Sequence, residues 1–93
     1  MRDIVRSSRF KRDYRRELRG RHGRILEREL RLVLEHLVIG QPLPERYRDH
    51  QLGGEWRGCR DCHLRPDLVL LYRIFPDRLE LVRLGSHAEL GLK

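Results

Sequence analysis

The stretch from Leu68 to Phe75 restricts most strongly how this chain can fold. It is an almost continuous apolar run, interrupted only by Arg73. Such a run, rich in branched and aromatic side chains, is typical of a strand that is covered on both faces. Pro66-Asp67 precedes the run, and Pro76-Asp77 follows it as a hairpin turn. We therefore expect a central strand at 68–75.

The N-terminal part of the chain has the pattern of a short strand followed by a helix. Residues 3–7 open with Ile4-Val5 and fit a first strand. Ser7 or Ser8 then supplies an N-cap for a helix. Its apolar positions are spaced as one helical stripe, at Phe10, Tyr14 and Leu18.

A second helix is predicted at 24–38. Gly20 and Gly23 separate it from the first helix, and Gly40 ends it. Its apolar residues fall on one face, which is typical of a helix packed on a core; they are Leu26, Leu30, Val33, Leu34 and Leu37. We expect the two helices to form a hairpin that turns both apolar stripes to a common partner.

Strands dominate the second half of the predicted fold. A turn-rich connector at 40–44 leads to a strand at 56–64, the central strand, and a strand at 79–84. The order β-α-α-β-β-β predicts an α+β sandwich, with two N-terminal helices on one side of an antiparallel β-sheet. A length of 93 residues predicts one domain spanning 1–93.

The charge balance narrows the choice of partner. The net charge is +7, and 19 of the 21 basic residues are arginines, because only Lys11 and Lys93 are lysines. Arginine binds phosphate in a bidentate way, so nucleic acid or an acidic protein is the expected partner. A GC-rich genome explains the arginine preference equally well, but it does not remove the charge. Neither a membrane-spanning run nor a secretory signal is present in the sequence, so we expect a cytoplasmic protein without a membrane partner.

Three of the five histidines lie in the predicted sheet: His50, His63 and His87. Asp61 and His63 share a face of their strand, because strand side chains alternate with period two. Arg83 lies in phase with Gly85, and His87 follows if that strand continues. If the strands that carry His63 and His87 expose the same face, the histidines and nearby carboxylates converge. His22 and His36, in the helical half, are expected on the surface.

Such a cluster is suited to cutting RNA through its own 2′-hydroxyl. That reaction needs a base for the hydroxyl proton, an acid for the departing 5′-oxygen and a cation for the phosphate. Histidine can serve as acid or base near neutral pH, and arginine supplies the cation. The chemistry itself requires no cofactor.

The sequence Cys59-Arg60-Asp61-Cys62-His63 also matches the C-x-x-C-H motif of haem attachment. The flanks are rich in arginine rather than apolar, and positions i and i+3 of a strand point to opposite faces, which argues against both haem and a disulfide. A zinc site formed by Cys59, Cys62, His50 and His87 is an alternative, supported by only one C-x-x-C. We expect two incidental thiols and no metal.

The aromatic residues divide between core and surface. The only tryptophan, Trp56, follows a Gly-Gly turn and is expected to anchor the core, although it can also stack on a base. Tyr14 and Tyr72 are expected in the core. Tyr47 is expected to be exposed.

A series of polar and glycine positions resembles YafQ-type toxins of the RelE/ParE superfamily. The resemblance covers nearly the whole chain and is densest from Leu43 to Leu90. The matching positions are Leu43-Pro44, Tyr47-Arg48-Asp49-His50, Leu52, Gly54, Trp56-Arg57-Gly58, Arg60-Asp61, His63, Pro66-Asp67, Leu71-Tyr72, Arg83, Gly85 and Ser86-His87-Ala88.

This resemblance implies a RelE-like (microbial RNase-like) sandwich and the activity of a type II toxin. Such a toxin binds the 70S ribosome and cuts translated mRNA in the A site, without a cofactor. It also implies a cognate antitoxin, which neutralises the toxin and through which the complex binds operator DNA.

By the same resemblance, His50 and His87 are the base and the acid, in an order left open. His63, Asp61 and Asp67 complete the catalytic site. Arg83 is the expected phosphate ligand, and we add Arg48, Arg57 and Arg65 as further RNA-binding candidates.

One position departs from the family pattern. Gly91 stands where family members carry an aromatic residue beside the substrate base. Leu90 or Leu92 is a partial substitute, and base stacking on an aromatic ring contributes about 1–3 kcal/mol. Two alternatives share the fold: a gyrase inhibitor that does not cleave, and an inactive antitoxin- or RNA-binding relative. Neither needs the histidine cluster.

Overall fold

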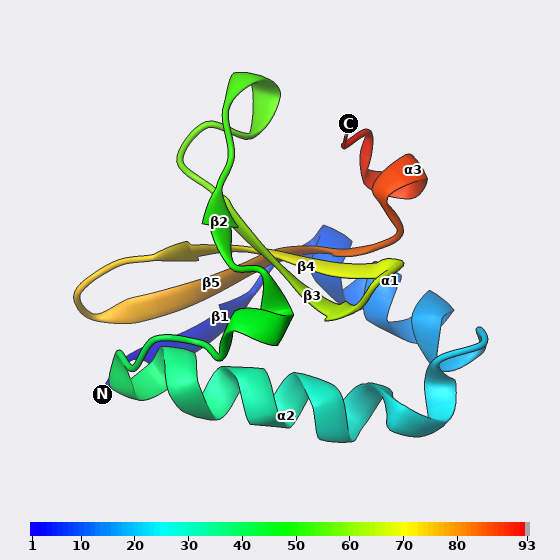
Figure 1. Cartoon of the computed structure of the whole chain (residues 1–93), viewed down its shortest axis with the longest axis horizontal. Coiled ribbons are helices and arrows are strands. Elements are labelled where there is room, and N and C mark those ends of the chain that lie inside the picture. Colours follow the sequence, from blue (N-terminus) through cyan, green and yellow to red (C-terminus); the bar gives the residue numbers. More distant parts are fainter. Residues whose placement is uncertain (93) are drawn as a thin grey trace.

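A five-stranded sheet forms the centre of the molecule, with helices on both faces (Figure 1). The structure is a computed structural model and describes residues 1–92. In chain order its elements are β1 (Asp3–Arg6), α1 (Ser8–Leu18), α2 (Gly23–Ile39), a 3-10 turn (Glu45–Tyr47), β2 (His50–Gln51), a second 3-10 turn (Gly54–Trp56), β3 (Arg60–Arg65), β4 (Leu68–Ile74), β5 (Arg78–Gly85) and α3 (His87–Leu90). None of the helices in this range is long and apolar enough to cross a membrane.

The sheet is mixed rather than wholly antiparallel. Its strand order is β1-β5-β4-β3-β2, and β1 runs parallel to β5 while the other pairs are antiparallel. The predicted α+β class is confirmed and the four predicted strands are present, but β2 and α3 were not predicted, and the antiparallel direction is wrong for β1. The hairpins fix the relative directions of β3, β4 and β5. The direction of β1 depends on a connection through both long helices, which no local pattern determines.

Strand β4 is the covered central strand that its sequence predicts. Leu68, Leu70 and Tyr72 are fully buried on the face toward the two long helices. Val69 and Leu71 are fully buried on the opposite face. This two-sided burial explains why the strand lacks polar alternation.

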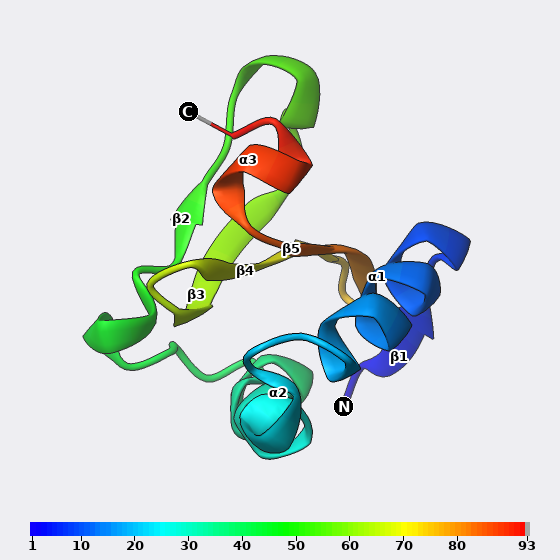
Figure 2. The same ribbon diagram turned by 90° about the vertical axis from the view of Figure 1, so that its right-hand side faces the viewer.

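The two long helices build the larger core with the sheet. Helix α2 lies across one face, and α1 lies beside β1 and β5 (Figures 1 and 2). Ser7 is the N-cap of α1 and Gly40 ends α2 in a left-handed conformation, as predicted. Leu18 is 45% exposed, so the buried stripe of α1 stops short of it. The buried helical residues of this core are Phe10, Leu26, Leu30, Val33 and Leu37.

The opposite face carries a smaller apolar cluster beneath α3. Leu90 of α3 packs there against Val69 and Leu71, with Trp56 partly buried beside them. Trp56 lies in a 3-10 turn, so the strand predicted from residue 56 begins only at Arg60. Its indole Nε1 donates a hydrogen bond to the carbonyl of Leu90 at 3.3 Å, which ties α3 to this turn.

Helix α1 completes the edge of β5 where β1 stops. The backbone N–H of Leu84 donates to Asp13 Oδ2 at 3.0 Å. Arg83 donates to both carboxylate oxygens of Asp13, at 2.7 and 3.1 Å, and Asp13 is only 3% exposed. Arg16 bonds to the Leu84 carbonyl and lies 3.2 Å from Glu89 of α3. The charged residues of α1 therefore support the segment that carries His87.

The other aromatic predictions had mixed outcomes. Tyr72 is fully buried, as predicted, and Tyr14 is half-buried against the larger core. The expectation of an exposed Tyr47 is wrong, because it is 3% exposed. Tyr47 lies in the 3-10 turn before β2 and packs into the larger core.

Candidate active site

Three histidines from three separate elements meet on the sheet face that carries α3. His50 comes from β2, His63 from β3 and His87 from the first turn of α3. The ring centroids of His50 and His63 are 6.4 Å apart, and those of His63 and His87 are 5.0 Å apart. All three rings line one hollow of about 620 Å³, together with Asp61 and Trp56.

Strand register explains this convergence. His50 lies opposite Asp61 in the β2–β3 pair, and Asp61 shares its strand face with His63. His63 lies opposite Val69, which in turn lies opposite Gly85 at the end of β5. The chain leaving Gly85 therefore reaches His63 within two residues. His87 begins α3 instead of extending the strand, because Ser86 forms a capping box with Glu89.

Asp61 is a buried carboxylate among the three rings. It is 2% exposed, and its Oδ1 lies 2.9 Å from His50 Nδ1. That nitrogen also lies 2.8 Å from the Arg48 carbonyl, and its single N–H is aligned with the carbonyl. Asp61 Oδ1 consequently has no hydrogen-bond donor within residues 1–92. Burial raises the pKa of Asp61, and the charges of His50, His63 and His87 oppose that rise.

His63 is the inner ring of the cluster. Its Nε2 is buried and without a hydrogen-bond partner among the described residues. Burial lowers its pKa below the usual 6.5, and the Asp61 charge partly offsets this effect. His63 is therefore held in its neutral form at neutral pH.

A buried network fixes the segment that leads into His50. Asp49 accepts hydrogen bonds from Arg60 Nε and Nη2, at 3.2 and 3.3 Å, and from the Tyr72 hydroxyl. Burial and the bond to Asp49 raise the pKa of Tyr72. Arg48 takes a left-handed conformation, with φ of 49°, which turns its carbonyl toward His50. Sequence reasoning missed the support from Tyr72, because residues 23 positions apart give no periodic signal.

Asp67 is placed apart from the histidine cluster. Its carboxylate lies 2.8 Å from His22 Nε2 and 3.1 Å from Arg21 Nη1. The hydrogen bond from His22 lowers the pKa of Asp67. His22, expected on the surface, is half-buried: its side chain is 16% exposed and holds this carboxylate.

The four arginine candidates occupy different surroundings. Arg83 is engaged with buried Asp13 and is itself 13% exposed. Arg57 is exposed after the second 3-10 turn. Arg48 and Arg65 line a second hollow of about 580 Å³, which His63 and His87 also line. Arg46 lines it as well and was missed in the sequence, where nothing separates it from the other arginines.

The cysteines do not form the zinc site considered from sequence. Both are buried and unbridged. Cys62 packs into the core under the long helices, on the opposite sheet face from His50, and burial raises the pKa of its thiol. Cys59 Sγ accepts a hydrogen bond from Arg73 at 3.3 Å. Residues 1–92 contain no group of three or more histidine, cysteine and acidic side chains placed to hold a metal.

Gly91, which stands where family members carry an aromatic residue, leaves open space at the end of α3. Gly91 ends α3 with φ of +69°, and a Cβ there would meet no atom within 4 Å. Gly91 and Leu92 both line the histidine hollow, whereas Leu90 is buried beneath α3. Trp56 is therefore the aromatic side chain that borders this hollow.

Comparison with known proteins gives a consistent result. The chain is 46% identical over 63 residues to a relative from Haemophilus influenzae, of which it spans 62%. It is 34% identical over 90 residues to the mRNA interferase toxin YafQ of Escherichia coli strain B, covering 96% of this chain and 95% of that protein. The crystal structure of the E. coli DinJ–YafQ complex matches with a TM-score of 0.84 at 33% identity, over 97% of this chain and 98% of that one.

The family model for YafQ, a bacterial toxin of type II toxin–antitoxin systems, matches residues 2–92. That range includes all three histidines and the elements that carry them. The chain belongs to the YafQ family of type II toxins.

Proposed function

We propose that this protein is a ribosome-dependent mRNA endoribonuclease that cuts translated mRNA in the A site, using the RNA 2′-hydroxyl as nucleophile. The convergence of His50, His63 and His87 around buried Asp61 carries the proposal. A toxin that acts by binding alone has no need for three histidines of this geometry. The mRNA interferase name of the E. coli relative supports the same activity.

His50 is suited to be the base. Its Nδ1 donates to the Arg48 carbonyl, so the neutral ring keeps its lone pair on Nε2. Nε2 takes the 2′-hydroxyl proton while the 2′-oxygen attacks phosphorus. Asp61 stabilises the positive charge that His50 gains, because its carboxylate lies 2.9 Å from the ring.

His87 is then the acid. Starting protonated, it gives its proton to the 5′-oxygen as the phosphorus–oxygen bond breaks. The products are a 2′,3′-cyclic phosphate and a 5′-hydroxyl, so protons and electrons balance without an outside reactant. His63, neutral and 5.0 Å from His87, packs against the acid and fixes its position.

Arginines that line the second hollow neutralise the negative charge of the phosphate. Arg48 and Arg65 line it beside His63 and His87, so a guanidinium can lie next to a phosphate held between the rings. Arg83 instead pairs with Asp13 of α1, near the end of β5 that leads into α3. In this proposal Arg83 is a structural residue, and Arg48 replaces it as the phosphate ligand.

The cognate antitoxin is the proposed protein partner, together with the 70S ribosome and mRNA. A YafQ relative has been crystallised in a complex with DinJ, described as a toxin–antitoxin complex. The basic surface, at +7 overall, fits both an acidic protein and ribosomal RNA. Operator DNA binding would then pass through the antitoxin.

A short pulse of expression in growing bacteria, with mRNA 5′ ends mapped, tests this proposal. Wild type should produce new in-frame cuts in translated messages, and His87→Ala should reduce them by at least about 100-fold. His36→Ala is the matched control, because His36 lies on α2, away from the cluster, and bonds the Leu32 carbonyl of its own helix. Growth arrest without cuts, or cuts that persist in His87→Ala, would contradict the proposal.

A further inference from the structure

The two hollows at the candidate active site share His63 and His87 but differ in their other lining residues. Arg46, Arg48 and Arg65 line the second hollow. Among residues 1–92, no arginine or lysine lines the histidine hollow, although the chain contains 19 arginines. Arginine is the side chain that binds phosphate best, so the two hollows are suited to different parts of a nucleotide.

The histidine hollow has an apolar wall beside its catalytic candidates. Leu52, Trp56 and Leu92 line it, and all three are partly buried against the small cluster that contains Leu90. The bond from the indole N–H to the Leu90 carbonyl holds the Trp56 ring in place before any substrate is bound. Unpaired bases of RNA stack on aromatic rings of this kind.

Glu55 is the one polar side chain of the histidine hollow that the proposed acid–base chemistry leaves unused. It lies in the second 3-10 turn, next to Trp56, and is exposed. Its carboxylate forms no ion pair within residues 1–92. A carboxylate repels phosphate, so in an RNA site it is suited to a hydrogen-bond donor on a base.

The four RNA bases differ in the donors that they offer to a carboxylate. Adenine and cytosine each carry an amino group on the Watson–Crick edge, and guanine carries an amino group beside a ring N–H. Uracil has a single N–H, which lies between two carbonyl oxygens that a carboxylate repels. A carboxylate at the base edge therefore favours an amino-bearing base over uracil.

We propose that the histidine hollow holds a base next to the cut, stacked on Trp56 and selected by Glu55 through its amino group. The inference rests on the proposed function and deepens it, because it names the residues that choose the substrate. Gly91 leaves room for such a base, since a Cβ there would meet no atom within 4 Å. The phosphate next to this base then lies toward Arg48 and Arg65 of the second hollow.

Cleavage of mRNA on purified ribosomes tests the role of Glu55. The messages differ only in the base on each side of the cut, and single-turnover rates are compared for the four bases. At one of the two positions, wild type should cut amino-bearing bases at least about tenfold faster than uracil, and Glu55→Ala should reduce this ratio to about threefold or less. General damage to the site would slow all four messages equally and leave the ratio unchanged.

Glu45→Ala is the matched control for Glu55→Ala. Glu45 is also an exposed carboxylate in a 3-10 turn, and it lines neither hollow. It should keep the wild-type ratio. The same change of ratio in Glu45→Ala would assign the effect to net charge and overturn the role of Glu55.

Two substitutions separate stacking by Trp56 from its bond to Leu90. Trp56→Phe keeps an aromatic ring but removes the indole N–H, whereas Trp56→Leu removes both. Stacking predicts that Trp56→Phe stays within about threefold of the wild-type rate and that Trp56→Leu loses about tenfold or more. Equal losses in the two variants, or no loss in Trp56→Leu, would overturn the stacking role.

Fluorescence reports stacking in the protein without any substitution, because Trp56 is the only tryptophan. The probe is a short 2′-deoxy oligonucleotide with amino-bearing bases, which lacks the nucleophile and is not cut. We expect saturable quenching of the Trp56 emission, and weaker quenching by an oligonucleotide of deoxyuridine. Emission that does not change with the first probe would overturn the stacking role.

The outcomes distinguish this inference from the proposed function. If wild type cuts none of the messages on ribosomes, the nuclease proposal fails, and the base site fails with it. If wild type cuts all four bases equally, or Glu55→Ala keeps the wild-type ratio, the nuclease proposal stands and the selection by Glu55 is overturned.

Discussion

Asp61 is the residue on which the proposed chemistry of the cluster depends. A carboxylate that is 2% exposed, with one oxygen lacking a hydrogen-bond donor, is costly to keep ionised. The surrounding imidazoles offset that cost when they carry a proton. The carboxylate therefore stabilises a protonated imidazole beside it. A histidine that acts as a base becomes protonated and benefits from this stabilisation.

Asp61→Asn tests this coupling. Burial lowers the pKa of His63, and the Asp61 charge opposes the decrease. Removing the charge should therefore move the His63 titration to still lower pH, as measured by NMR of the imidazole signals. Asp67→Asn is the control, because Asp67 bonds His22 outside the cluster and its loss should leave the His63 titration unchanged. A His63 midpoint that stays fixed in Asp61→Asn, or rises, would contradict the coupling.

Single-residue predictions succeeded where the strand period decided them. The shared face of Asp61 and His63 follows from counting along one strand, and the structure places both beside His50. Asp67 and Arg83 are different, because their partners lie far away in the chain, in the turn before α2 and on α1. His22 is 45 positions from Asp67 and Asp13 is 70 positions from Arg83, so no sequence pattern shows these pairs.

At the scale of elements, the short helix α3 depends on its neighbours. Four residues do not form a stable helix alone. The capping box of Ser86, the Trp56 bond to Leu90 and the Arg16–Glu89 pair hold it in place. Because His87 begins α3, these contacts also set the position of the proposed acid.

The bond between α1 and β5 gives a prediction for stability. Asp13→Asn removes the negative charge that pairs with the Arg83 guanidinium. It should lower the free energy of unfolding by about 3 kcal/mol. Asp77→Asn is the control, because that carboxylate is 79% exposed and its pair with Arg78 contributes little. Urea unfolding of the three proteins at pH 7 measures the difference.

The pH dependence of that difference follows from the pKa of Asp13. Burial raises this pKa, but hydrogen bonds from Arg83 and Leu84 outweigh burial and lower it below its usual 3.8. The stabilisation is therefore complete above about pH 4 and is lost as the pH falls through the lower, folded value. The gap between wild type and Asp13→Asn should close in that acid range. A gap that is constant down to pH 2 would contradict the ion pair.

Elements were predictable from sequence when their pattern extended over several residues. The helical periodicity of α1 and α2 is visible over several turns, and β4 is marked by a nearly continuous apolar run; all three occur where predicted. Strand β2 has two residues and α3 has four, so neither is long enough for its pattern to recur. Strand β2 carries His50 and α3 carries His87. The sequence therefore predicted a histidine cluster but not the two short elements that position these histidines.

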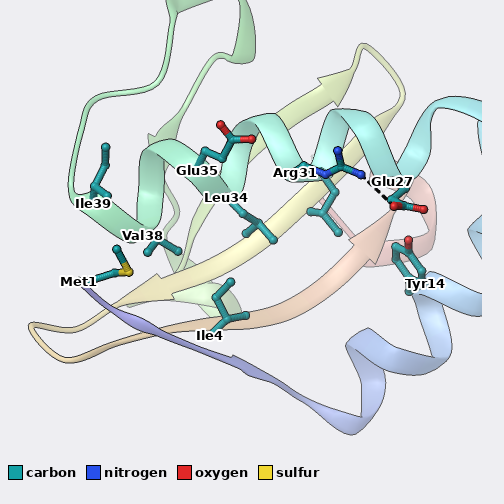
Figure 3. Close-up of a pocket in the computed structure, with 10 residues that line it drawn as sticks. Met1, Ile4, Tyr14, Glu27, Arg31, Leu34, Glu35, Val38 and Ile39 are labelled. Carbon is teal, nitrogen blue, oxygen red and sulfur yellow. Dashed lines mark hydrogen bonds and ion pairs between the residues drawn. The ribbon is translucent and has the colours of Figure 1, made fainter.

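At the scale of the molecule, the fold separates two surfaces. Residues of β2, β3 and α3 line the histidine hollow, and a separate, mostly apolar pocket lies beside α2 (Figure 3). The α+β class could be predicted because the order of elements determines the layers. The parallel pairing of β1 could not be predicted, since it joins residues 75 positions apart, such as Asp3 and Arg78.

The positive charge of the whole molecule predicts salt-dependent binding to ribosomes. Arginines that contact phosphate release counterions, so association should weaken steeply as salt increases. Arg48→Ala should lower the slope of log K against log salt by roughly one. Arg28→Ala, on the exposed side of α2, should leave the slope unchanged. Sedimentation with ribosomes across a salt series measures both, and association that does not respond to salt would contradict a phosphate-binding surface.

The chemical ends of the cut mRNA test the central claim most directly. Attack by the 2′-hydroxyl, with His50 and His87 as base and acid, predicts a 2′,3′-cyclic phosphate on one fragment and a 5′-hydroxyl on the other. The 5′ ends should then accept label from a polynucleotide kinase without prior phosphatase treatment. Fragments ending in a 5′-phosphate and a 3′-hydroxyl would mean that water attacked instead of the ribose, and would contradict the proposed role of the histidine cluster.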